Sequence, residues 1–143
     1  MELITVEMIA PCGVDCGACS VHQRAKAPCP GCNSLIEDAK TEARSRCRIK
    51  SCLQSKGLHP ADHAFCEKFP CRRMRSLDER YRLKYAASPA DNLRTIRDRG
   101  IDAFVLDETV RWTCTQCGAR LSMHKEACPV CDTNWRNGKT DQF

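Results

Sequence analysis

The clearest periodic pattern of apolar residues lies in the middle of the chain. Between residues 71 and 86 the apolar side chains recur at steps of three and four residues, at Met74, Leu77, Tyr81 and Tyr85. The remaining positions of this stretch are largely charged. Such spacing places the apolar side chains on one face of a helix. We therefore predict an amphipathic helix over residues 71–86.

Two further helices are predicted directly after it. Ser88 is a good N-cap residue, Pro89 suits the first helical position, and Gly100 ends the pattern. A short third helix is indicated by the apolar spacing of Ile101, Phe104 and Val105. We expect these helices to act as a packing brace between the segments on either side.

The flanking segments carry weaker patterns. Apolar positions predict one helical stretch over residues 35–46 and a second over residues 48–56, which stops at Gly57. The rest of residues 9–75 is expected to be loop. Near the C-terminus, residues 112–113 and 119–123 are predicted as short strands that frame a cysteine-rich turn.

Cysteine content changes the picture most. Thirteen of the 143 residues are cysteine, and most stand in short-spaced clusters. So many thiols form either a disulfide framework in an oxidising compartment or a set of metal ligands. The first residues lack the basic and apolar regions of a secretory signal, and no apolar run approaches the ~20 residues that span a bilayer. We expect a cytoplasmic protein that does not engage membranes and holds its thiols as metal thiolates.

The most specific motif is near the C-terminus. Cys114-x-x-Cys117-Gly118 and Cys128-Pro129-Val130-Cys131 are separated by ten residues, an arrangement similar to a zinc ribbon. Each Cys-x-x-Cys forms a knuckle, and two knuckles supply four tetrahedral ligands at about 2.3 Å. Gly118 provides the positive φ that a knuckle favours. Because a Cys₄ shell leaves no open position, this ion is expected to be structural.

The N-terminal segment offers a larger set of ligands. We assign metal binding to His63 and to nine cysteines: Cys12, Cys16, Cys19, Cys29, Cys32, Cys47, Cys52, Cys66 and Cys71. His63 is included because it stands three residues before Cys66, and we assign the other histidines to solvent or packing. Two tetrahedral ions need only about eight ligands, so a surplus is unavoidable. Cys19, Cys47 and Cys52 are the candidates for a reactive thiol, with a pKa lowered by Arg46, Arg48 or Lys50.

Three arrangements of these ligands stay open. They are two separate four-ligand sites with spare thiols, a bridged zinc cluster, and an iron–sulfur cluster. The spacing Cys12-x₃-Cys16-x₂-Cys19 is shared with the cluster motif of radical-SAM enzymes, but no series of alternating strands and helices accompanies it. We favour zinc, with about three ions in the whole chain.

Charge and composition limit the remaining choices. The formal charge of +5 counts every thiol as neutral. With each thiolate subtracting one and each of three zinc ions adding two, it becomes about −2. Residues 40–100 nevertheless hold sixteen Lys/Arg against seven Asp/Glu, which keeps nucleic-acid binding as an alternative. With only eight aromatic residues, the core is expected to be small and to depend on metal.

The N-terminal pattern is similar to domain-of-unknown-function family 3795. The similarity is carried by APCGVDCGAC at residues 10–19, CPGC at 29–32, CRIKSC at 47–52 and CEKFPC at 66–71. It covers about residues 8–75, and a ribbon-like tail similar to residues 111–131 accompanies some members. The family more often has cysteine where this chain has His63. The resemblance implies a metal-binding domain and no particular reaction.

Together these features predict a small metal-stabilised α+β protein. Its expected parts are a loop-rich Cys cluster with short helices at residues 1–75, a helical connector at 76–110 and a β zinc ribbon at 111–143. No Ser-His-Asp arrangement, phosphate loop or open metal position argues for catalysis. We therefore expect a non-enzymatic zinc protein that binds another protein. The alternatives are a redox or iron–sulfur protein and a nucleic-acid-binding module.

Overall fold

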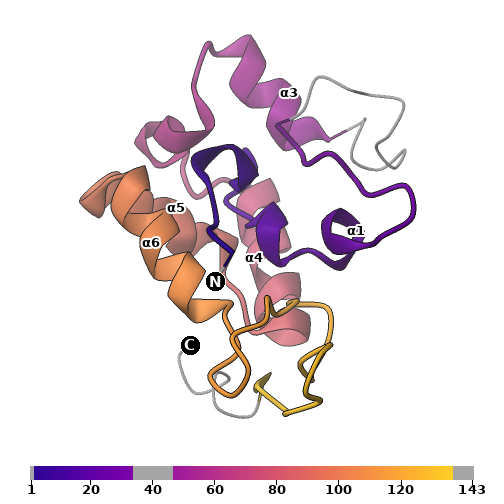
Figure 1. Ribbon diagram of the computed structural model, residues 1–143. Coiled ribbons are helices and arrows are strands. Elements are labelled where there is room, and N and C mark those ends of the chain that lie inside the picture. Colours follow the sequence, from indigo (N-terminus) through magenta and orange to yellow (C-terminus); the bar gives the residue numbers. More distant parts are fainter. Residues whose placement is uncertain (1, 34–46, 137–143) are drawn as a thin grey trace.

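Helices make up the regular structure of this protein. The computed structural model describes residues 2–33 and 47–136. Figure 1 shows α3 and the C-terminal loops at opposite ends of the molecule, with α5 and α6 along one side. The helical elements are η1 (Val6–Met8), η2 (Cys16–Ala18), α1 (Ser20–Gln23), α3 (Arg48–Ser55), η4 (Pro60–Phe65), α4 (Arg72–Tyr85), α5 (Pro89–Arg99) and α6 (Ile101–Arg111).

The predicted helices in the middle of the chain are confirmed. Helix α4 occupies the stretch expected from the apolar spacing, and α3 matches the second N-terminal prediction. Helix α5 begins as predicted, because Ser88 Oγ accepts a hydrogen bond of 3.1 Å from the Asp91 N–H. Gly100 ends it with φ of +87°. Helix α6 runs for 11 residues and is longer than the short helix that we predicted. The helix predicted over residues 35–46 lies outside the described residues.

The predicted α+β class and the β zinc ribbon are wrong. No strand occurs in residues 2–33 and 47–136, where pairing is limited to three isolated antiparallel bridges. Two of them lie in the C-terminal unit, Thr113 with Arg120 and Ala127 with Asn134. A longer ladder does not form because Trp112 directly follows α6, while the Met123 N–H donates to Ala18 O in the N-terminal segment at 2.9 Å. Both flanks of the cysteine-rich turn are thus hydrogen-bonded to other segments of the protein.

A continuous core joins the N-terminal, central and C-terminal segments. Its buried members include Ile4, Met74, Leu93, Phe104 and Trp112. The loop at Gly13 is pressed against α5, where a Cβ on Gly13 would stand 2.4 Å from Pro89 O. Asn92 Nδ2 also donates to Gly13 O at 2.9 Å. This contact fixes the first cysteine motif on the helical brace. No helix within the described ranges has the length and apolar character that crossing a bilayer requires.

Candidate metal centres

Four C-terminal thiols converge on one point. The sulfurs of Cys114, Cys117, Cys128 and Cys131 all lie within 4.8 Å of one another. Cys114 Sγ is 3.6 Å from Cys131 Sγ, and Cys117 Sγ is 3.6 Å from Cys128 Sγ. Four ligands at about 2.3 Å from a tetrahedral ion would be separated by roughly 3.8 Å. This group could therefore hold a metal ion with little rearrangement of its side chains.

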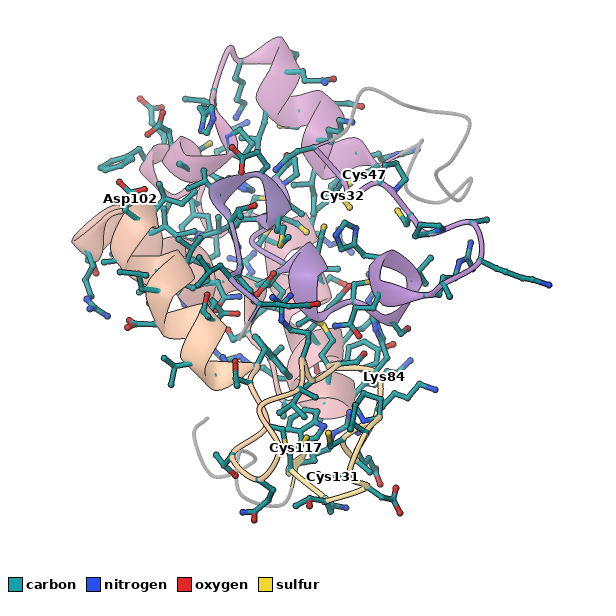
Figure 2. The ribbon with its side chains drawn as sticks, viewed as in Figure 1. Cys32, Cys47, Lys84, Asp102, Cys117 and Cys131 are labelled. Atoms are coloured by element: carbon teal, nitrogen blue, oxygen red, sulfur yellow. The ribbon has the colours of Figure 1, made fainter. Side chains whose placement is uncertain are left out.

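The two halves of this Cys₄ unit have the same local geometry. In the first, Gly118 has φ of +77° and its N–H donates to Cys114 O at 2.9 Å. In the second, Asp132 has φ of +61° and its N–H donates to Cys128 O at 3.0 Å. Left-handed residues of this kind reverse the chain after each Cys-x-x-Cys and direct both sulfurs inward. Figure 2 shows Cys117 and Cys131 close together, one from each half.

The thiols of this unit compete for protons. A hydrogen bond with the Thr133 side chain lowers the pKa of Cys131 to about 6. The backbone at Ala119 lowers the pKa of Cys117, but burial and hydrogen bonds with the other thiols outweigh it and raise that pKa to about 12. A divalent cation reverses this balance, because it stabilises every thiolate that it binds.

Both tryptophans of the chain pack together in the C-terminal unit. The rings of Trp112 and Trp135 meet edge to face, with centroids 5.1 Å apart. Trp112 Nε1 donates to the buried Glu108 Oε2 at 2.7 Å. The unit also contacts the N-terminal segment, since Arg120 donates to Gly17 O at 3.0 Å. The Cys₄ unit is thus held on the core by aromatic packing and hydrogen bonds.

A second group of thiols, here the first thiol cavity, lies apart from the Cys₄ unit. It has a volume of about 610 Å³. Figure 2 places Cys32 and Cys47 far from Cys117 and Cys131. The Cys32 N–H donates to Cys16 Sγ at 3.5 Å. Five cysteines line this cavity, together with three arginines: Cys12, Cys16, Cys19, Cys32, Cys47, Arg48, Arg73 and Arg80.

Protonation differs among these thiols. Burial raises the pKa of Cys12 to about 12, and contact with Cys32 together with burial raises the pKa of Cys16. Burial also acts to raise the pKa of Cys19, but the His124 side chain and the backbone of His22 and Val21 outweigh it and lower this pKa to about 7. The sequence predicts a lowered pKa for one of three candidates that include Cys19. The groups that lower the pKa of Cys19 are different from Arg46, Arg48 and Lys50, the basic residues that the sequence suggested.

A third group, here the second thiol cavity, has a volume of about 390 Å³. It is lined by Cys52, His63, Cys66 and Cys71, and by Lys56. Lys56 Nζ donates to Cys66 Sγ at 3.3 Å. Neither N-terminal cavity brings three donor atoms as close together as the Cys₄ unit, which is the one such group found within the described ranges. Cys29 lines neither cavity; it is buried, and its N–H donates to Val21 O at 2.9 Å.

Sequence reasoning misses some of the groups around these thiols. It assigns His124 to solvent or packing, and the ring does pack on Tyr85. It misses that His124 Nδ1 accepts from the Ser20 N–H at 3.1 Å and that this side chain lowers the pKa of Cys19. It also gives the arginines of α4 no partner. Arg73, Leu77 and Arg80 recur at helical spacing, and this is the signal that could have placed them on one face towards the thiols.

These features define a helical, cysteine-rich protein with one preformed Cys₄ group. A family model described as protein of unknown function (DUF3795) matches residues 8–76. The match supports the assignment of the N-terminal segment to this family and ends before the Cys₄ unit. No match was found among curated proteins or among solved structures.

Proposed function

We propose that this chain is a non-catalytic zinc protein in which the ions hold the fold and which acts by binding another protein. The observation that carries the proposal is the convergence of four sulfurs within 4.8 Å at Cys114, Cys117, Cys128 and Cys131. A set of four thiolates favours zinc and fills its tetrahedral shell. Such an ion has no vacant position for a substrate. Thiolates of this kind are stable in a reducing cytoplasm, where we place the protein.

Helix α6 offers the support for a protein partner. Leu106 and Val110 stand one turn apart on this helix and are 64% and 69% exposed. Val110 borders a groove of about 800 Å³ between α5, α6 and the Cys₄ unit, which Trp135 and Asn134 also line. Exposed aliphatic side chains beside a groove with an aromatic residue favour a polypeptide partner.

Local ion pairs at Arg82 and Arg94 count against a role of these two arginines in nucleic-acid binding. Arg82 pairs with Asp78 at 2.6 Å and with Asp91 at 2.8 Å, and Arg94 also pairs with Asp91. Charge that is balanced locally contributes little to the release of counterions from a polyanion. Retention on heparin that is lost at moderate salt would favour the nucleic-acid alternative, and absence of retention would remove it.

The zinc proposal is tested by native mass spectrometry combined with tryptophan fluorescence. We expect intact protein to carry zinc and a chelator to change the emission, because both tryptophans pack beside the Cys₄ unit. A Cys114→Ser variant should lose one ion and give the emission of the chelated protein. A protein that contains no zinc after purification under reducing conditions would overturn the proposal.

A second candidate function is an iron–sulfur or thiol redox role for the first thiol cavity. It is favoured by the five cysteines that line this one cavity. Cluster ligation by cysteine thiolates requires several sulfurs within reach of one another. Anaerobic purification separates the two candidates. A brown protein with iron and sulfide would favour the second, and a colourless protein loaded with zinc would remove it.

A further inference from the structure

The second thiol cavity brings together cysteines from three elements. Cys52 lies in α3, Cys66 follows η4, and Cys71 is the N-cap residue of α4. The Lys56 ammonium group stands among them. It donates to Cys66 Sγ at 3.3 Å and interacts electrostatically with Cys52 and Cys71 as well. All three thiols therefore lie near one positive charge.

His63 lines the same cavity and is oriented by its other nitrogen. The ring is buried, with 6% of the residue exposed. Its Nδ1 lies 2.7 Å from Pro11 O, so Nδ1–H is the donor and Nε2 is left with its lone pair. A histidine that binds a metal commonly donates its second ring N–H to a backbone carbonyl in this way. Phe69 packs against the ring edge to face at 5.6 Å and fixes its orientation.

We propose that Cys52, His63, Cys66 and Cys71 form a Cys₃His zinc site that is separate from the first thiol cavity. The inference rests on the proposed function for the identity of the ion and adds the ligand set. Three sulfurs and one imidazole nitrogen are a regular donor set for structural zinc.

Charge balance supports this assignment. Three thiolates and one divalent ion carry a net charge of about −1, which one lysine ammonium group neutralises. Lys56 would then donate to a coordinating sulfur from outside the ligand shell. The sulfurs must still move towards the ion, because they are not all within 4.8 Å of one another. Cys52, Cys66 and Cys71 are all only partly buried, which leaves their side chains room to rotate towards an ion.

The assignment divides the N-terminal thiols between two centres. Three cysteines and His63 belong to the second thiol cavity, and the other six cysteines remain for the first thiol cavity and its surroundings. A single bridged cluster of all nine thiols is therefore excluded by the proposal. Loss of a ligand in one centre should leave the ion of the other in place.

The test compares substitutions of His63 in the full-length protein by native mass spectrometry. His63→Asn should carry one ion fewer than the unsubstituted protein, because Asn replaces the imidazole with a weak ligand. His63→Cys should restore the full ion count, because it completes a Cys₄ shell. His59→Asn is the matched control. His59 Nδ1 caps η4 by accepting from the Ala61 N–H at 3.1 Å, and Asn caps helices equally well.

Cobalt substitution and thiol labelling provide independent measurements. With Co²⁺ in place of zinc, His63→Cys should increase the intensity of the sulfur-to-metal absorption, since it adds a thiolate. In the native zinc protein we expect iodoacetamide to leave Cys52, Cys66 and Cys71 unlabelled. All three should become reactive together when the ion that they share with His63 is removed. This measurement needs no variant and decides the question if His63→Asn fails to fold.

Some outcomes would overturn the site without affecting the proposed function. They are an unchanged ion count in His63→Asn, or labelling of Cys52, Cys66 and Cys71 in protein that retains zinc at the Cys₄ unit. An absence of zinc throughout the molecule would instead contradict the proposed function. Cys114→Ser separates the two, because it should remove the C-terminal ion and leave the labelling of these three thiols unchanged.

Discussion

The Cys₄ unit and the N-terminal thiols use the same residue type at similar spacing but reach different degrees of organisation. The four C-terminal sulfurs lie within 4.8 Å of one another and come from eighteen consecutive residues. Thiols of the first cavity come from positions as far apart as Cys12 and Cys47. The backbone of each knuckle directs the C-terminal sulfurs, whereas the sulfurs of the first thiol cavity depend on how η2, α3 and α4 pack.

The energetic consequence follows from chain entropy. Closing a short loop costs little, so two adjacent knuckles can meet without help from the rest of the fold. Residues distant in sequence meet only when packing or metal binding offsets a larger cost. We therefore expect the arrangement of the C-terminal thiols to depend chiefly on their ion, and that of the N-terminal thiols to depend on both packing and metal.

The largest effect is expected for Cys128→Ser. Cys128 is buried, and its loss leaves a three-sulfur site in a unit whose folding free energy is metal binding free energy, roughly 10–16 kcal/mol for structural zinc in small peptides. We expect the loss of one ion, unfolding of residues 112–136 and a red shift of tryptophan emission. Native mass spectrometry and fluorescence measure these changes.

Cys19→Ser is the N-terminal comparison for this experiment. The first thiol cavity contains five cysteines, which exceeds the four that one tetrahedral ion needs. The variant should therefore keep the wild-type ion count, and its tryptophan emission should stay the same. If Cys19→Ser loses metal as completely as Cys128→Ser, the N-terminal thiols form a bridged cluster and the difference between the two regions disappears.

Packing of the N-terminal motif is tested by Gly13→Ala. Its φ of +88° disfavours any side chain, and the added Cβ would stand 2.4 Å from Pro89 O and 2.7 Å from Leu93 Cγ. We expect the free energy of unfolding to fall by about 3 kcal/mol or more. Denaturant unfolding followed by far-UV circular dichroism measures this change.

Gly57→Ala is the control for backbone strain alone. Gly57 has φ of +66° with no atom within 4 Å of an added Cβ, so only the cost of a left-handed alanine remains, about 1 kcal/mol. Equal losses in the two variants would mean that contact with α5 contributes little. The N-terminal segment would then depend on its metals as fully as the C-terminal unit does.

Sequence patterns predicted local features well. Ser88, Pro89 and Gly100 identified the ends of α5 because capping depends on neighbouring residues only. Cys114 and Cys117 identified a knuckle for the same reason. The expected strands were wrong because the N–H groups of Trp112 and Thr113 bond to α6, and that of Met123 bonds to the N-terminal segment. The grouping of thiols into two cavities likewise depends on tertiary packing, which periodicity does not encode.

Asp15 lies where the N-terminal segment meets α6 and the C-terminal unit, and it makes the stability of the protein depend on pH. Burial, reinforced by the nearby Glu108 carboxylate, raises the pKa of Asp15 to about 8 from its ordinary value of 3.8. The folded state thus holds a proton that the unfolded chain has lost. Stability contributed by this group falls as the pH rises from about 4 to about 8.

Asp15→Asn should remove this dependence. Asn keeps an oxygen that accepts from the Gly17 N–H, which Asp15 Oδ1 now does at 2.8 Å. At pH 8 the free energy of unfolding of the variant should equal that of the wild type or exceed it by about 1 kcal/mol. Between about pH 6.5 and pH 8 the free energy of unfolding should also change less in the variant than in the wild type. Denaturation in excess zinc measures both. Asp102→Asn, on an exposed residue, should leave the slope unchanged; a slope that persists in Asp15→Asn would contradict the prediction.

The smallest effect is expected for Gly118→Asn in the first knuckle. Gly118 has φ of +77° with no atom within 4 Å of an added Cβ, and the equivalent position of the second knuckle already holds Asp132 at φ of +61°. Asn tolerates the left-handed region at least as well as Asp, so zinc binding in the variant should weaken by no more than about 0.5 kcal/mol. Gly118→Val should weaken zinc binding by at least about 1 kcal/mol more than Gly118→Asn, because branching at Cβ disfavours the left-handed conformation. The measurement is zinc affinity by competition with a chromogenic chelator. Equal affinities in the two variants would show that knuckle geometry does not limit binding, and that the ion rather than the backbone organises the C-terminal thiols.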